Sequence, residues 1–416
     1  MNHRGAEDAE EEVRESSADL AAQEEERWFE RGMQQIKEGD FRGAVASFDK
    51  ALAINPDDDE TWYNRGVALF KLGKYEEAIA SYDKALVINP NFYQAWTMRG
   101  VALAMLRKYK RALASYDKAL AINSNNYITW TMRGNALEEL EKYEEMLASC
   151  DKALAINPDY YKAWYNRGVA LSNLGKDEEA IASYDKALAI NPDYYLAWGN
   201  RGLALGELGE YEEAITSFDK ALAINPDDYE AWYNRSIALS DLGKYEEAIA
   251  SYDKALTFNP EYYEAWNSRG VALSDLGEYE EAIASFDKAL TINPEYYEAW
   301  YNRSIALSDL GKYEEAIASY DKALAINPEY YEAWYNRGNG LFNLGKYEEA
   351  IASYDKALAI NPNDYEAWYN RGVALSDLGK YEEAIASYDK ALAINPEYYP
   401  ASYNRSVALA NLKEQE

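Results

Sequence analysis

Apolar and polar residues alternate in one pattern that recurs every 34 positions along the chain. Trp62, Leu69 and Leu72 fall on one face of a predicted first helix, at about 100° per residue. Gly73 then breaks the helix, and the apolar face of a second helix follows at Tyr75, Ala78, Ile79, Tyr82, Ala85 and Leu86. Pro90 ends the second helix because proline cannot continue it. The sequence therefore predicts a helical hairpin of 34 residues.

The hairpin repeats along almost the whole chain. All eleven tryptophans are 34 residues apart, at 28, 62, 96, 130, 164, 198, 232, 266, 300, 334 and 368. We number the repeats 1 to 12 and place tryptophan at position 4 of each, with Ser402 in its place in repeat 12. Each hairpin has apolar surface left over, which stacking on its neighbours would bury, so the pattern predicts a one-dimensional solenoid.

The residue pattern of the repeat resembles that of the tetratricopeptide repeat. The matching positions in repeat 2 are Trp62, Arg65-Gly66, Leu69, Ala78, Tyr82 and Pro90. Two departures are systematic, since arginine replaces the family's leucine and leucine replaces its tyrosine. The resemblance covers about residues 25–416, and near-identical arrays of this kind are found in bacterial proteins. It implies an all-α, right-handed superhelical solenoid of stacked helix-turn-helix hairpins.

The two ends of the chain differ from the repeats. Residues 1–24 are acidic and aperiodic, so we expect a disordered tail, with a short helix near Val13–Gln23 as the alternative. Residues 25–398 hold eleven repeats of 34 residues. Residues 399–416 stop after one helix, which we expect to cap the last exposed interface.

Arginine stands at position 7 of all twelve repeats, from Arg31 to Arg405, and aspartate at position 25 of every complete repeat, from Asp49 to Asp389. A buried arginine is costly without a partner. We therefore predict an Arg–Asp ladder between helices, with the partner in the same or the preceding repeat. Recognition of an anionic ligand by these arginines is the competing interpretation.

The resemblance also implies that the first helix of each repeat lines a concave surface that holds extended peptides. Polar residues are most consistent on that face in repeats 7–11. The candidate binding residues are Asn234, Asn302, Asn336 and Asn370 at position 6, Glu230, Glu298, Glu332 and Glu366 at position 2, and Tyr233, Tyr301, Tyr335 and Tyr369 at position 5. An amide both donates and accepts, which suits contacts to peptide backbone. The alternatives are that the asparagines make inter-repeat or capping hydrogen bonds, or that recent duplication copied them.

Repeats 3 and 4 depart most from the others. Ser124 replaces the turn proline, Arg107 and Glu141 replace the hinge glycine, and Cys150 stands where other repeats have tyrosine or phenylalanine. Residues 107–111 form the only dense basic cluster. Either a second binding site in repeats 3 and 4 or neutral drift in older copies of the repeat would explain these departures.

Charge and residue content restrict the chemistry. With 42 basic and 73 acidic side chains, the net charge of -31 opposes binding to nucleic acid or to anionic membranes and favours basic partners. A single cysteine, Cys150, suits a reducing compartment, and we expect a cytoplasmic protein. His3 is the only histidine, so no histidine-based triad or metal cluster is expected, and no cofactor.

These features favour a non-enzymatic scaffold that binds an extended peptide or a partner protein, of basic or polar character, in its groove. A regulatory subunit of a separate enzyme and a structural spacer without a groove ligand are the alternatives. The pattern specifies neither the identity of the partner nor an oligomeric state.

Overall fold

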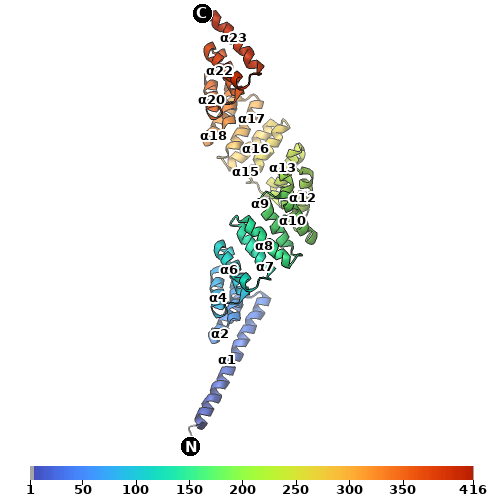
Figure 1. The fold of residues 1–416 in the computed structure, drawn as a ribbon, viewed down its shortest axis with the longest axis vertical. Coiled ribbons are helices and arrows are strands. Elements are labelled where there is room, and N and C mark those ends of the chain that lie inside the picture. The colour runs from blue at the N-terminus through green and yellow to red at the C-terminus, as the bar shows by residue number, and fades with distance from the viewer. Residues whose placement is uncertain (1–3, 416) are drawn as a thin grey trace. The chain divides into compact units, whose positions relative to one another are not determined.

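The computed structural model describes residues 4–415, and their side chains from residue 19 onward. Every regular element in this part of the chain is an α-helix, which confirms the predicted all-α fold (Figure 1). The chain divides into two compact units, Met1–Gly209 and Glu210–Glu416, which we call the N-unit and the C-unit. Within each unit, consecutive helices pair as hairpins and each hairpin packs against the next.

The helices of the N-unit are α1 (Arg4–Glu38), α2 (Phe41–Ile54), α3 (Asp59–Lys71), α4 (Tyr75–Ile88), α5 (Tyr93–Met105), α6 (Tyr109–Ile122), α7 (Tyr127–Glu138), α8 (Tyr143–Ile156), α9 (Tyr161–Asn173), α10 (Asp177–Ile190) and α11 (Tyr195–Glu207). Those of the C-unit are α12 (Tyr211–Ile224), α13 (Tyr229–Asp241), α14 (Tyr245–Phe258), α15 (Tyr263–Asp275), α16 (Tyr279–Ile292), α17 (Tyr297–Asp309), α18 (Tyr313–Ile326), α19 (Tyr331–Asn343), α20 (Tyr347–Ile360), α21 (Tyr365–Asp377), α22 (Tyr381–Ile394) and α23 (Tyr399–Gln415).

The turn inside each hairpin depends on a residue in the left-handed region. In repeat 2, Gly73 has φ +74°, and the backbone N–H of Lys74 donates to the carbonyl of Leu69, which ends α3. Repeats 3 and 4 keep this turn without glycine, because Arg107 and Glu141 adopt φ 56° and 57°. These two side chains impose a cost of about 1–2 kcal/mol each that glycine avoids.

The turn between repeats is fixed by tryptophan. The indole Nε1 of Trp62 donates to the carbonyl of Pro56 at 2.9 Å, and the same bond recurs as far as Trp368 and Pro362 at 3.0 Å. In repeat 4, Trp130 donates to Ser124 at 2.9 Å, so the serine preserves the contact that proline makes elsewhere. The 34-residue spacing of tryptophan thus marks one structural bond per repeat.

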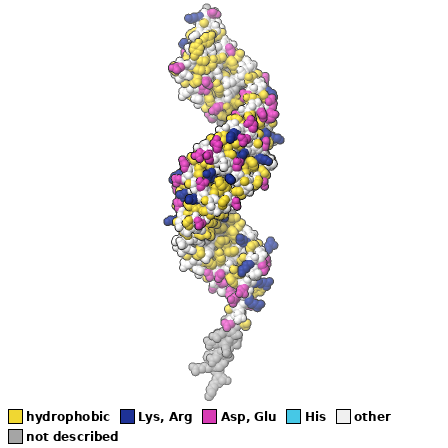
Figure 2. Space-filling view, turned by 90° about the vertical axis from the view of Figure 1, so that its right-hand side faces the viewer, with side chains coloured by type: hydrophobic (Ala, Val, Ile, Leu, Met, Phe, Trp, Pro, Cys, Tyr) yellow, Lys and Arg dark blue, Asp and Glu magenta, His cyan; other side chains and the backbone are white. Residues whose placement is uncertain are grey.

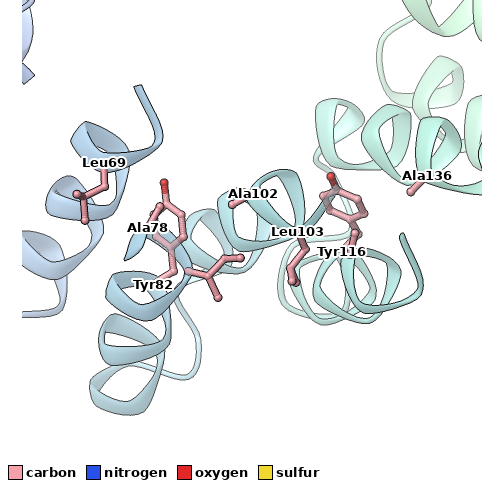
Figure 3. Packing of buried hydrophobic residues seen from close by; sticks show 9 residues of the cluster. Leu69, Ala78, Tyr82, Ala102, Leu103, Tyr116 and Ala136 are labelled. Atoms are coloured by element: carbon pink, nitrogen blue, oxygen red, sulfur yellow. The ribbon is translucent and has the colours of Figure 1, made fainter. Parts of the chain in front are cut away.

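An aromatic side chain of the second helix fills each hairpin. Tyr82 is fully buried, and a Cβ atom on Gly66 would lie 2.5 Å from its ring, so a larger residue here requires the ring to shift. Ala102 of the next repeat belongs to the same cluster and lies beside the Tyr82 ring, as Ala136 lies beside Tyr116 (Figure 3). The small positions of one repeat thus accommodate the aromatic ring of its own or the preceding repeat.

In repeat 4, different residues fill the interior of the hairpin. Cys150 replaces the aromatic ring, and Met146 takes the place of the alanine one turn earlier; both are fully buried. Gly134 of α7 faces the Cys150 sulfur, which would be 3.4 Å from an added Cβ atom. The larger methionine therefore offsets the smaller cysteine, so the two substitutions form a matched pair.

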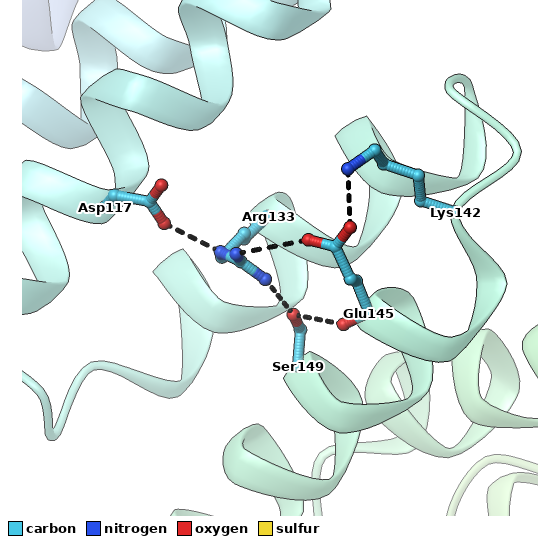
Figure 4. Close-up of polar contacts among 5 residues, drawn as sticks. All are labelled: Asp117, Arg133, Lys142, Glu145 and Ser149. Atoms are coloured by element: carbon cyan, nitrogen blue, oxygen red, sulfur yellow. Dashed lines mark hydrogen bonds and ion pairs between the residues drawn. The ribbon is translucent and has the colours of Figure 1, made fainter.

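An ionic ladder joins the repeats, as predicted. In Figure 4, the guanidinium of Arg133 reaches Asp117 and Ser149, with Nε 2.8 Å from Asp117 and Nη1 2.7 Å from the Ser149 hydroxyl. The aspartate belongs to the preceding repeat and the serine to the same repeat. The same contact recurs in every repeat from that of Arg65 to that of Arg405, with 2.5–2.8 Å between the arginine Nε and the aspartate Oδ1. The sequence did not predict the serine.

The N-terminal segment differs from the expectation of a disordered tail over residues 1–24. Helix α1 begins at Arg4 and continues to Glu38 without a break, while residues 1–3 lie outside the described part of the chain. Alanine, glutamate and arginine, which are frequent in this segment, favour helix even without an apolar face. At the other end, α23 occupies the segment expected to form a single capping helix.

Candidate functional site

Tyrosines form a packed row on the first helices of the C-unit. Tyr301 is half-buried, with its ring 6.1 Å from Tyr320 of the same hairpin and 4.8 Å from Tyr330 at the following turn. Tyr233 and Tyr369 have equivalent aromatic neighbours. Burial is the main cause that raises the pKa of the Tyr301 hydroxyl, so this group stays neutral at physiological pH.

The position-6 asparagines link one repeat to the next. The Nδ2 of Asn336 donates to the hydroxyl of Tyr301 at 3.1 Å, and that of Asn370 donates to Tyr335 at 2.9 Å. Asn302 donates to Asn267, which replaces the tyrosine in repeat 8, at 3.0 Å. The geometry therefore matches the inter-repeat hydrogen bond that was the alternative to direct peptide recognition. Asn234 is half-buried in α13.

The position-2 glutamates border the tyrosine row. Glu230, Glu332 and Glu366 are exposed, and Glu298 is partly exposed. The hydroxyl of Tyr365 donates to Glu366 at 3.3 Å. Burial and, to a smaller extent, the nearby carboxylates of Glu332 and Glu298 raise the pKa of Tyr330. Burial raises the pKa of Tyr301 and of Tyr335, and Glu332 and Glu366 add a smaller contribution, so the negative charge of these two glutamates lies close to the tyrosine row. Figure 2 shows acidic side chains interspersed with hydrophobic ones on the visible face.

A cavity of about 400 Å³ opens between repeats 10 and 11. It brings together two predicted residues, Tyr369 and Asn370, with five that the sequence analysis did not select: Asn339, Phe342, Asn343, Tyr354 and Val373. Asn339 organises the wall, since its Oδ1 accepts from the Tyr354 hydroxyl at 2.8 Å and from Asn370 Nδ2 at 3.2 Å. The available signal was the segment NGLFN, residues 339–343, where repeat 11 reads VALSD.

A second cavity of about 420 Å³ lies one repeat further on, between repeats 11 and 12. Its lining is Val373, Ser376, Asp377, Tyr381, Tyr388, Asn404, Val407, Ala408 and Asn411. The Ser376 and Tyr388 hydroxyls lie 3.1 Å apart, so a serine here takes the part of Asn339 in the first cavity. The two cavities occupy equivalent places but differ in charge, because Asp377 stands where the first has Asn343.

Repeats 3 and 4 carry polar contacts of their own in the N-unit. The Thr97 and Thr129 hydroxyls lie 2.9 Å apart, and Asn166 donates to Asn135. Burial raises the pKa of the Cys150 thiol to about 12, with smaller contributions from neighbouring carboxylates. A buried thiol with a raised pKa is a poor nucleophile. Over the side chains that the structure describes, no group of three or more His, Cys, Asp or Glu residues is placed to hold a metal ion.

Helix length and hydropathy give one further finding. Within the described residues, every helix is either too short or too polar to cross a lipid bilayer.

Comparisons with known proteins agree with the repeat structure. Family models of the tetratricopeptide repeat match residues 34–73, 60–126, 161–194, 183–216 and 200–399. The model of the protein prenyltransferase alpha subunit repeat matches residues 143–174. No curated protein matches the chain.

Solved structures with a similar fold include the following three. YrrB, described as a TPR protein with an unusual peptide-binding site, is 28% identical, with 44% of this chain and 95% of that chain covered and a TM-score of 0.40. A tetratricopeptide repeat protein from Parabacteroides merdae is 23% identical, covering 60% and 98%, with a TM-score of 0.45. A chain of the APC/C hetero-tetramer Cut9-Hcn1 is 15% identical, with 92% of this chain and 96% of that chain covered and a TM-score of 0.45.

The matching family models span most of both units, and the tryptophan bond and the left-handed hinge recur in the same register along the array. The chain belongs to the tetratricopeptide repeat family.

Proposed function

We propose that this protein is a non-enzymatic scaffold whose first helices in the C-unit bind an extended, basic or polar segment of a partner protein. One observation carries the proposal: the cavity between repeats 10 and 11 is lined by Tyr369 and Asn370, two of the residues selected from the sequence. Concave sites with apolar walls and a few placed polar groups are the usual form of a binding site.

The tyrosine row supplies the contact surface in this proposal. Tyrosine offers a large apolar area with a polar tip at low entropic cost. The asparagines act indirectly, since each Nδ2 of Asn336 and Asn370 holds the tyrosine of the preceding repeat. Their amide oxygens supply further acceptors for backbone N–H groups.

The negative charge of this protein is the reason why we propose that the bound segment is basic. Glu332 and Glu366 are exposed beside the aromatic row, and the chain carries a net charge of -31. Packed helices lie about 8–10 Å apart, and an extended peptide advances about 3.3–3.6 Å per residue. Lysines about three residues apart would therefore meet the acidic groups of successive repeats. A reducing location such as the cytoplasm suits the unpaired Cys150.

The test is a binding titration with a defined peptide. The probe is a fluorescein-labelled peptide in which lysine recurs every third residue, with glycines between and alanine at the centre. Replacing Glu298, Glu332 and Glu366 by glutamine in the full chain is expected to weaken binding about tenfold, at about 0.5 kcal/mol for each exposed charge.

A matched control removes the same charge from the second helices. Glu314→Gln, Glu348→Gln and Glu382→Gln alter exposed glutamates near the starts of α18, α20 and α22. Binding to this variant is expected to stay within threefold of the unchanged protein. Equal losses in both variants, or no binding of the peptide to the unchanged protein, would refute the proposed site.

A further inference from the structure

We propose that the cavity between repeats 10 and 11 is a selectivity pocket that takes an aromatic side chain of the bound segment, flanked by basic residues. This inference rests on the proposed function and adds the recognised residue type. It starts from three exchanges at positions 9, 12 and 13 of the repeat: Asn339, Phe342 and Asn343 occur where repeat 11 has Val373, Ser376 and Asp377.

The exchanges build a wall of aromatic rings. Phe342 is half-buried and its ring lies 5.2 Å from Tyr347, which holds it in place at the cavity. Tyr354 and Tyr369 line the same cavity. Aromatic rings pair favourably at centroid distances of about 4.5–7 Å, in addition to the effect of burial. An inserted aromatic ring would therefore gain contacts here that an aliphatic side chain of equal size lacks.

Two asparagines at the cavity differ in whether their side chains are already hydrogen-bonded. Asn339 accepts two hydrogen bonds, from Tyr354 and Asn370, so its position is set. The exposed amide of Asn343 has no hydrogen bond to any described side chain, and it can meet the polar tip of a tyrosine or tryptophan. The volume of about 400 Å³ lies within the range of about 300–1,000 Å³ that ligand pockets occupy.

Charge separates this pocket from its neighbours in the array. Position 13 is aspartate in the repeats on either side, Asp309 and Asp377, and both are exposed. Asn343 interrupts this series with a neutral group. A lysine or arginine is therefore favoured one repeat before and one repeat after the pocket, while a neutral residue is favoured within it. The predicted ligand has an aromatic residue with basic residues about three positions away on each side.

The experiment uses the lysine peptide described above, with alanine, leucine, lysine or tyrosine at its central position. Titrations of the full chain are expected to show tyrosine binding about tenfold more tightly than alanine, and more tightly than leucine or lysine. The test variant is Asn339→Val with Phe342→Ser and Asn343→Asp, which gives repeat 10 the residues of repeat 11 at positions 9, 12 and 13. The tyrosine preference is expected to fall below threefold in this variant.

The variant is built to fold. Repeat 11 holds these residues in the same places, and there the Ser376 hydroxyl lies 3.1 Å from that of Tyr388, so a serine at 342 can replace Asn339 as the partner of Tyr354. A melting curve close to that of the unchanged protein checks this point, and the alanine peptide checks that the groove still binds.

The outcomes separate the two proposals. Equal binding of the tyrosine and alanine peptides to the unchanged protein overturns the pocket while leaving the groove in place. A tyrosine preference that survives in the variant also overturns it, because the ring must then bind elsewhere. Failure of every peptide to bind overturns both the pocket and the proposed function.

Discussion

Replacement of Arg235 by methionine tests the ladder that joins the repeats. In the structure, Nε of Arg235 lies 2.7 Å from Asp219, Nη1 lies 2.5 Å from the Ser251 hydroxyl, and the guanidinium lies 5.9 Å from the centre of the Trp232 ring. Methionine keeps much of the apolar stem and removes all three interactions. We expect the substitution to destabilise the C-unit, because its effect falls on the contact between α12, α13 and α14.

The magnitude follows from the exposure of the partners. The side chain of Arg235 is 18% exposed and that of Asp219 is 54% exposed, so the ion pair contributes only about 0.2–1 kcal/mol. The stacking on Trp232 adds about 0.5–1 kcal/mol. Loss of the hydrogen bond from Nη1 to Ser251 adds about 0.5–1 kcal/mol and no more, because Ser251 keeps its own hydrogen bond to the carbonyl of Glu247 and its hydroxyl is not left unpaired. The expected loss is therefore about 2 kcal/mol, below the 3–5 kcal/mol of a fully buried pair.

Guanidinium denaturation and native-state hydrogen exchange measure this loss. Exchange is needed because a long array can unfold in parts, and then one global free energy is not defined. Amides of α12–α14 are expected to lose about 2 kcal/mol of protection, and those of α3–α6 none. Lys254→Met removes an equally charged, exposed side chain nearby and should change stability by less than about 0.5 kcal/mol. An Arg235→Met protein that matches this control would refute the ladder.

Three further predictions concern packing, backbone and pH. Cys150→Tyr alone should destabilise the chain by about 1–3 kcal/mol through overpacking, and adding Met146→Ala should restore most of it in thermal melts. Arg107→Gly should stabilise by up to about 1 kcal/mol, because relief of the left-handed φ exceeds the extra backbone entropy that glycine loses on folding, whereas Glu144→Gly within α8 should destabilise by about 0.5–1 kcal/mol. Burial raises the pKa of Tyr252 to about 12, so its stabilising contribution is complete below pH 10 and is lost as the pH rises towards 12. The difference in absorbance at 295 nm between the unchanged protein and Tyr252→Phe, followed together with circular dichroism, should show that Tyr252 ionises only as the chain unfolds, and its ionisation at pH 10 in the folded protein would contradict this.

The repeat architecture was predictable because one residue in nearly every turn, a glycine or a proline, ends the helix before it. The break at Gly73 and the stop before Pro90 correspond to the ends of α3 at Lys71 and α4 at Ile88. The Arg–Asp ladder was also predictable, since two opposite charges recur in register. Its direction was not, because the sequence allows Arg65 to meet Asp49 or Asp83, and only the stacking of hairpins selects Asp49.

The polar face was harder to interpret from the sequence. Asn336 was visible as part of a series, but its bond to Tyr301 spans 35 residues, and periodicity alone does not show which groups such a spacing brings together. The same limit applies to the cavity. The exchange at Asn339 was readable in repeat 10, whereas its contacts with Tyr354 and Asn370 depend on how α19, α20 and α21 pack.

The most direct test of the central claim, that the first helices of the C-unit bind an extended basic segment, is photo-crosslinking. The lysine peptide with benzoylphenylalanine at its centre is irradiated with the full chain, and the adducts are located by mass spectrometry. We predict adducts in α19 and α21, at residues of the cavity such as Phe342 and Val373. Adducts confined to the second helices or to the N-unit, with α19 and α21 unmodified, would contradict the claim.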